Sequence, residues 1–204
     1  TLVYGPDGES PVDDSDLTEH LDSQMYELAY VNIPLYNTST FVFASDDQKA
    51  QMLQLAQAAA ASCSETQDGS VSEQVSALHS AASAALPDIY AVLGGTADNT
   101  SPQTELLGSS TLDSTFTQSG SADTIRNLAY GQAAAVQYSS YAMMLALRVD
   151  PLSVASLDDL RDQVITDMKT SELKTALSDY GASLENHLDA SAMNKLPMTK
   201  IVNK

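Results

Sequence analysis

The chain has 204 residues, 43% of them hydrophobic, and a formal net charge of −18. That length can bury the core of one domain, and the hydrophobic fraction excludes wholesale disorder. Residues 1–120 hold 17 acidic residues against one basic residue, whereas residues 121–204 hold 10 against 8. This charge excludes nucleic-acid binding, because no cluster of cations is available to neutralise phosphates.

The first predicted elements are an arm and a helix. Residues 1–14 mix Pro, Gly and acidic residues without an apolar period, so we expect a flexible N-terminal arm. A helix should begin at Asp14–Asp16 and end at Ile33-Pro34, because proline disfavours helical geometry in the residue before it. Apolar residues recur at helical spacing between these points: Leu17, Leu21, Met25 and Leu28.

Residues 33–44 form the one segment with β-like composition, with Phe41, Val42 and Phe43 in a row. A single short segment cannot make a sheet on its own. The sequence therefore predicts either a short hairpin or an extended aromatic loop folded over helices.

Capping boxes predict the next two helices, one beginning at Ser45 with Gln48 and one at Ser70 with Glu73. Pro87 should kink or restart the second of these helices. Residues 94–120 are rich in Gly, Ser, Thr and Asn, and they are expected to form a long crossover loop that contains one helical turn.

Residues 127–147 lie between two arginines and contain no charged side chain. A helix without charge on any face is normally buried on most sides, so this stretch is predicted to be the central helix. Its glutamines and serines argue against a bilayer span, and no transmembrane segment is expected.

The last helical stretch is expected to begin at Ser156 and to slip in phase near Thr170-Ser171. An apolar stripe then follows: Leu173, Leu177, Tyr180, Leu184 and Leu188. Residues 192–204 form a basic C-terminal tail. Together the elements predict an all-α fold, a helical bundle of about five helices over residues 15–191, with a buried central helix, one long crossover loop and at most one short β-hairpin.

No pattern of residues indicates catalysis or a cofactor. Cys63 lies on the apolar stripe of an alanine-rich helix, which favours a buried structural thiol over a nucleophile paired with His79. The acidic residues around Asp13–His20 lack the central glycine and closing glutamate of a calcium loop. The chain is therefore predicted to be non-enzymatic and to hold neither metal nor cofactor.

Two other patterns are weak. Glu185, His187 and Asp189 do not have the spacing of zinc ligands on a helix. The triplets beginning at Asn37 and Asn99 match the glycosylation pattern, which arises often by chance in chains rich in Ser and Thr.

The split of charge along the chain favours a structural or adaptor subunit of a larger assembly, with a filament or a cell-surface structure as candidates. The acidic N-terminal half and the terminal arms would bind a protein partner or a second copy of the chain. In the tail, Lys195, Lys200 and Lys204 would make the contact. Scarce lysine and abundant Ser, Thr, Gln and Asp favour an extracellular or periplasmic location.

The alternative hypothesis is an extracytoplasmic sensing bundle that binds a small molecule. Its cavity would be lined by the tyrosines and glutamines of the predicted central helix: Tyr130, Gln132, Gln137, Tyr138 and Tyr141. The same tyrosines could instead lie at ordinary interhelical seams.

Overall fold

The computed structural model describes residues 4–8, 10–63, 68–96 and 101–183. The chain divides into two compact units, Thr1–Ile165 and Thr166–Lys204. The described residues form seven helices and four strands. In chain order these are α1 (Asp14–Gln24), β1 (Met25–Pro34), α2 (Asp46–Cys63), α3 (Val71–Ala91), β2 (Gln103–Gly108), α4 (Ser109–Thr115), α5 (Ser121–Arg126), β3 (Ala133–Gln137), β4 (Ala142–Val149), α6 (Pro151–Val154) and α7 (Leu157–Ser183).

The prediction of an all-α bundle is wrong, because the first unit is built on a four-stranded sheet. The strand order is β2-β1-β4-β3, and every pair of neighbours is antiparallel. The longest pairing joins β1 to β4, with Tyr30 opposite Ala146 and Ile33 opposite Met143. The fold is therefore mixed α/β.

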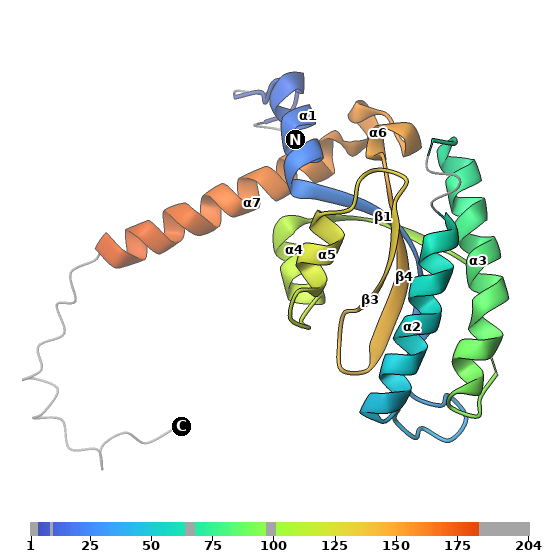
Figure 1. The fold of residues 1–204 in the computed structure, drawn as a ribbon. Coiled ribbons are helices and arrows are strands. Elements are labelled where there is room, and N and C mark those ends of the chain that lie inside the picture. The colour runs from blue at the N-terminus through green and yellow to red at the C-terminus, as the bar shows by residue number, and fades with distance from the viewer. Residues whose placement is uncertain (1–3, 9, 64–67, 97–100, 184–204) are drawn as a thin grey trace, which may run out of the picture. The chain divides into compact units, whose positions relative to one another are not determined.

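Helices cover both faces of the sheet (Figure 1). The face covered by α2 and α3 is built from alternate residues of the central strands: Ala29, Val31, Ile33, Met143, Leu145, Leu147 and Val149. The face covered by α4 and α5 is built from the residues between them, including Tyr26, Leu28, Met144 and Ala146. Strand β4 and the first half of β1, Met25 to Ala29, are thus buried on both sides, whereas Asn32 further along β1 is exposed.

The predicted central helix, residues 127–147, is a turn followed by β3 and most of β4. Met143 to Leu147 are indeed buried, with at most 5% exposure, but as a strand covered on two faces. Such a strand has no polar face, so its sequence resembles that of a buried helix and periodicity cannot separate the two. The reversal before β3 uses Gly131 at φ +77°.

The predicted helix from Asp14 to Pro34 is wrong in its second half. Leu17 and Leu21 are fully buried on α1, as the helical spacing predicts, but the chain changes to strand at Met25. The residues that follow are rich in aromatic and β-branched types, which favour a pleated surface over a helix. The long loop predicted over residues 94–120 likewise contains β2, α4 and the gap of residues 97–100 that lies outside the described residues.

Both predicted capping boxes are confirmed. Ser70 and Glu73 satisfy each other's backbone donors at the start of α3, and Ser45 and Gln48 do the same before α2. Helix α3 runs from Val71 to Ala91 as one helix with Pro87 inside it, so the chain does not restart a helix at Pro87.

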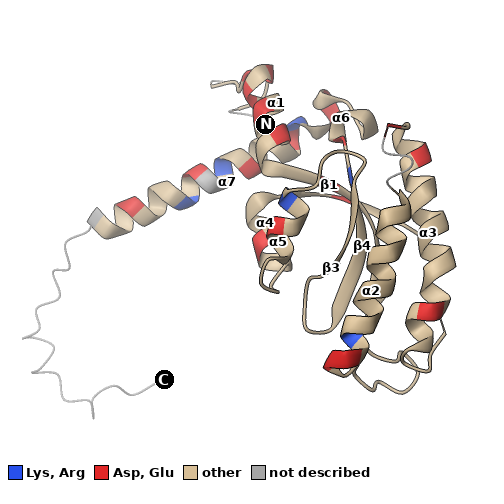
Figure 2. Cartoon of the chain, viewed as in Figure 1, with Lys and Arg blue, Asp and Glu red and all other residues tan. Residues whose placement is uncertain are grey.

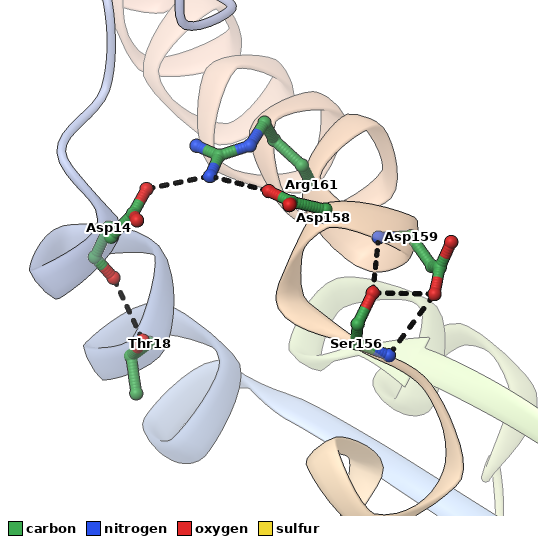
Figure 3. Close-up of polar contacts among 6 residues, drawn as sticks. All are labelled: Asp14, Thr18, Ser156, Asp158, Asp159 and Arg161. Atoms are coloured by element: carbon green, nitrogen blue, oxygen red, sulfur yellow. Dashed lines mark hydrogen bonds and ion pairs between the residues drawn. The ribbon is translucent and has the colours of Figure 1, made fainter.

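One buried cation joins α1 to the start of α7 (Figure 3). The Arg161 guanidinium lies 2.7 Å from the Asp14 carboxylate and 3.1 Å from that of Asp158. Ser156 and Asp159 begin the same helix with a reciprocal hydrogen-bonded cap. Residues from opposite ends of the first unit are therefore held together by charge as well as by apolar contacts.

The second unit is described up to Ser183, where α7 ends. Leu173, Leu177 and Tyr180, members of the predicted apolar stripe, are 60–64% exposed. The rest of that stripe and the basic tail lie outside the described residues.

The covered sheet makes a direct prediction about stability. Leu145 is 1% exposed on β4, so Leu145→Ala should lower the free energy of unfolding by about 2–5 kcal/mol through lost burial and the cavity left behind. Urea unfolding measures this change. Leu177→Ala, at a position 61% exposed, is the matched control and should change stability by less than about 0.5 kcal/mol. Equal effects of the two substitutions would contradict the two-sided burial of β4.

Candidate functional site

Five large apolar side chains gather at the surface around the segment between β1 and α2. We call the four rings of this group the aromatic surface: Tyr36, Phe41, Phe43 and Tyr141. Phe41, Val42, Phe43 and Tyr141 are 72%, 64%, 58% and 60% exposed. The four rings touch one another, with centroids 5.7–6.3 Å apart in the pairs Tyr36–Phe41, Tyr36–Phe43 and Phe43–Tyr141. Segments distant in sequence thus build one contiguous aromatic patch.

A short hairpin carries most of this surface. Tyr36 and Phe43 form an isolated antiparallel bridge, and the Asn37 amide donates to the carbonyl of Val42 at 2.9 Å. Of the segment predicted over residues 33–44, Ile33 and Pro34 belong to β1, and the rest reverses direction in a short hairpin closed by a single isolated bridge. The Leu35 amide donates to the carbonyl of Tyr141 at 2.7 Å, which ties the hairpin to the turn between β3 and β4.

Asn37 fixes the shape of the hairpin from inside. Asn37 is only 8% exposed, and its side-chain Oδ1 accepts hydrogen bonds from the amides of Ser39 and Thr40, both at 3.0 Å. Its Nδ2 donates to the Leu93 carbonyl at 2.9 Å, just after α3. The hairpin is therefore anchored to the helical layer, and the Asn37 amide is not presented for glycosylation. The second triplet, at Asn99, lies outside the described residues.

Phe41 is the one non-glycine residue with positive φ in the part of the chain that the structure describes, at +57°. A bulky residue in this region costs on the order of 1–3 kcal/mol and persists only where its surroundings dictate the conformation. Phe41 is 72% exposed, and its one ring contact among the described residues is the stacking on Tyr36. Strain that presents an aromatic ring to solvent is typical of a binding surface.

Acidic residues adjoin the aromatic surface. The hairpin leads directly into the first turn of α2, which carries Asp46 and Asp47. Lys49 in the same turn is paired with Asp46 at 3.1 Å. The end of α3, which carries the exposed Asp88, is joined to this region by the hydrogen bond from Gln48 Nε2 to the Val92 carbonyl. Figure 2 shows acidic positions, coloured red on the ribbon, at the neighbouring ends of α2 and α3.

The structure does not bring the three tyrosines of the alternative hypothesis together. Tyr130 lies before β3, Tyr138 follows its last residue, and Tyr141 belongs to the aromatic surface. The Tyr138 hydroxyl donates to Asn32 Oδ1 at 3.1 Å while its ring lies against Phe116, and burial raises the pKa of Tyr138.

Tyr130 has a structural partner in Arg148. The Arg148 guanidinium carbon lies 4.9 Å from the ring centroid of Tyr26 and 5.0 Å from that of Tyr130. Its Nη1 donates to the carbonyls of Leu128 and Arg126 at 2.8 and 3.3 Å. This cation, held between two aromatic faces, fixes the turn before β3.

The two glutamines of the alternative hypothesis make local contacts. Gln132 Oε1 accepts a hydrogen bond from the Ala129 amide at 3.0 Å, within the turn before β3. Gln137 Nε2 donates to the Ser139 carbonyl at 3.0 Å, at the other end of the strand. Gln132 therefore shapes the turn that leads into β3, and Gln137 shapes the turn between β3 and β4.

Cys63 and His79 differ in their surroundings. Cys63 is 1% exposed and lies 3.6 Å from the Ala59 carbonyl, and burial raises the pKa of its thiol. His79 is exposed on α3. A thiol with a raised pKa and no access to solvent is a poor nucleophile.

Within the described ranges, no group of three or more His, Cys, Asp or Glu side chains is placed to hold a metal ion. In the same ranges, no helix combines the length and apolar character needed to cross a membrane. Of the residues singled out in the sequence, Glu185, His187 and Asp189 lie outside the described residues. So do Lys195, Lys200 and Lys204 of the tail.

No protein-family model matches the sequence, and no curated protein or solved structure matches it either. Function must therefore be inferred from the residues and their geometry alone.

The sequence marks Phe41, Val42 and Phe43 as an unusual apolar run, but no site is predicted there from the sequence alone. The missed signal is that neighbouring residues of a strand point to opposite sides. Three large apolar residues in a row, in a segment too short to be covered on both faces, must leave at least one exposed.

Glu27 supplies a prediction that depends on pH. It is 7% exposed in β1, and burial, followed by the charge of Glu105, raises the pKa of its carboxyl group. The folded state therefore binds this proton more tightly than the unfolded state, and stability falls as the pH rises from about 4.3, the ordinary pKa of glutamate, through the raised value. Glu27→Gln removes this penalty.

Accordingly, Glu27→Gln should increase the free energy of unfolding at pH 7 and leave it nearly unchanged at pH 3.5. Urea midpoints at the two pH values measure the difference. Glu19→Gln, on the exposed side of α1, is the control and should show little change at either pH. A Glu27→Gln variant that is less stable than wild type at pH 7 would contradict the conclusion that the buried Glu27 carboxylate destabilises the folded state.

Proposed function

We propose that this chain is a non-catalytic interaction protein, a subunit or adaptor that binds a protein partner through the aromatic surface. The observation that carries the proposal is the contiguous patch of exposed rings at Phe41, Phe43 and Tyr141, joined through the half-buried ring of Tyr36. Large exposed apolar patches are uncommon on soluble monomers and mark sites of association.

The composition of the patch also supports binding. Aromatic side chains are enriched among the residues that dominate the energy of protein interfaces, because each buries a large area at a small cost in side-chain entropy. Acidic residues of α2 and α3 adjoin the rings, as a polar rim adjoins the apolar centre of many interfaces.

Pre-organisation strengthens the case. The hairpin is already held by the hydrogen bonds of Asn37 and by the bridge between Tyr36 and Phe43. A partner therefore does not have to order the hairpin on binding, and less of the interaction energy is lost to conformational entropy. Phe41 keeps its positive φ while it stacks on Tyr36 and stays 72% exposed, so most of its surface is available to a partner.

The sensing alternative gains no comparable support. The hydroxyl groups of Tyr130 and Tyr138 already donate to Asp22 and Asn32, at 3.2 and 3.1 Å, and the two rings lie at opposite ends of β3.

Photo-crosslinking tests the proposed function. Replacing Phe43 with p-benzoyl-phenylalanine should yield discrete adducts with a protein, either a second copy or a component of an extract from the native source. The same probe at Tyr180, 64% exposed on α7, is the control. Adding Phe41→Ser to the Phe43 probe variant should weaken capture about tenfold or more, as expected when an interface anchor worth more than 1.4 kcal/mol is removed.

A loss of capture supports the proposal only if Phe41→Ser leaves the fold as stable as the wild type. Phe41 is too exposed for its removal to open a cavity, so the Phe41→Ser variant should unfold at the same or a higher urea concentration than wild type. If the probe at Phe43 gives no adduct beyond those of the Tyr180 control, or if Phe41→Ser leaves capture unchanged, the aromatic surface is not a protein-binding site.

A further inference from the structure

The surroundings of the aromatic surface define the chemistry of its partner. The rings favour a partner with apolar or cationic groups, since aromatic faces attract both. The adjoining helix ends carry Asp46, Asp47 and Asp88, with Lys49 as a nearby cation that is already paired. A complementary partner is therefore apolar and basic.

Two aromatic surfaces would match each other poorly. A symmetric contact places the same patch of both copies face to face, so the acidic residues that adjoin each patch would approach their own counterparts. Like charges brought together at an interface disfavour the pairing. The partner segment is thus expected to differ from the surface that it binds.

Residues 192–204 of this same chain have the required chemistry. The segment contains three of the nine basic residues and no acidic residue. Between and beside its lysines lie apolar residues of types that contact aromatic rings well: Leu196, Pro197, Met198, Ile201 and Val202. Methionine sulfur and lysine ammonium groups both favour aromatic partners, and proline-containing segments bind aromatic-lined surfaces.

The other cations of the chain are largely engaged elsewhere. Four of those in the described residues pair with carboxylates: Lys49, Arg126, Arg161 and Lys169. Arg148 lies between two tyrosine rings. The lysines of residues 192–204 are the densest group of cations in the sequence.

We propose that residues 195–204 of one copy bind the aromatic surface of a second copy, with the lysines over the rings and beside the acidic ends of α2 and α3. The inference rests on the proposed function and names its partner. Because the two contacting surfaces differ, the contact is head-to-tail and can continue into a ring or a filament.

A peptide with the sequence of residues 192–204 tests the chemistry of the contact. Labelled at its N-terminus, it should bind the full chain with micromolar affinity in a fluorescence anisotropy titration. Binding should weaken about threefold or more between 50 and 500 mM NaCl, because salt screens the exposed charges. A peptide with all three lysines replaced by glutamine should bind at least about tenfold more weakly.

Two matched double variants of the full chain test whether the peptide binds at the aromatic surface. The Phe41→Ser/Phe43→Ser variant should lose peptide binding, while Leu173→Ser/Leu177→Ser, which removes two equally exposed apolar residues from α7, should keep it. Loss of binding in both variants, or in neither, would overturn the assignment of the segment to the aromatic surface.

Mixing two full-length variants tests whether the contact joins two copies. One variant carries Lys195→Gln/Lys200→Gln/Lys204→Gln and keeps its aromatic surface; the other carries Phe41→Ser/Phe43→Ser and keeps its lysines. Each alone should sediment as a monomer, and the mixture should form a one-to-one dimer. A monomeric mixture would overturn the proposal.

The result also separates the two proposals. If Phe43 photo-crosslinks to a protein in a manner that depends on Phe41, but neither the peptide nor the mixed variants bind, the proposed function stands and residues 195–204 are not the occupant.

Discussion

The fold depends on the burial of β4 and of the first half of β1 on both faces. Adjacent residues of a strand point to opposite sides, so a strand covered on both sides must be apolar at consecutive positions. Met143 to Leu147 meet this requirement without interruption. Among the polar residues of these strands, Asn32 lies on the exposed part of β1, Arg148 is enclosed by tyrosine rings, and Glu27 keeps a carboxyl group with a raised pKa.

The position of the aromatic surface follows from the same arrangement. After Pro34 the chain leaves the covered sheet and has to reach α2 on one face, and the hairpin makes that connection. Leu35 still belongs to the core, whereas Phe41 and Phe43 lie beyond the cover of either helical layer. The Asn37 side chain, bonded on one side to the hairpin and on the other to Leu93, converts this connection into a fixed surface.

Local signals in the sequence predict where helices begin, but they do not decide whether a buried segment is a helix or a strand. The caps at Ser45 and Ser70 marked helix starts correctly, because a cap is a contact between residues three apart. Residues 127–147 were correctly expected to be largely buried, but the choice between helix and strand depends on partners distant in sequence, such as Ala29 and Tyr30 opposite Leu147 and Ala146. The aromatic surface depends on Tyr141 meeting Phe43 and on the anchor of Asn37 to Leu93, and no local pattern reveals either contact.

The central claim is that the aromatic hairpin is a rigid surface prepared for binding rather than a mobile loop. Backbone ¹⁵N relaxation of the full chain tests it most directly. The account predicts order parameters for residues 36–43 of about 0.8 or higher, close to those of β1, and a clear fall in the Asn37→Ala variant, which loses the anchor to Leu93. Order parameters below about 0.6 for these residues in the wild-type chain would contradict it.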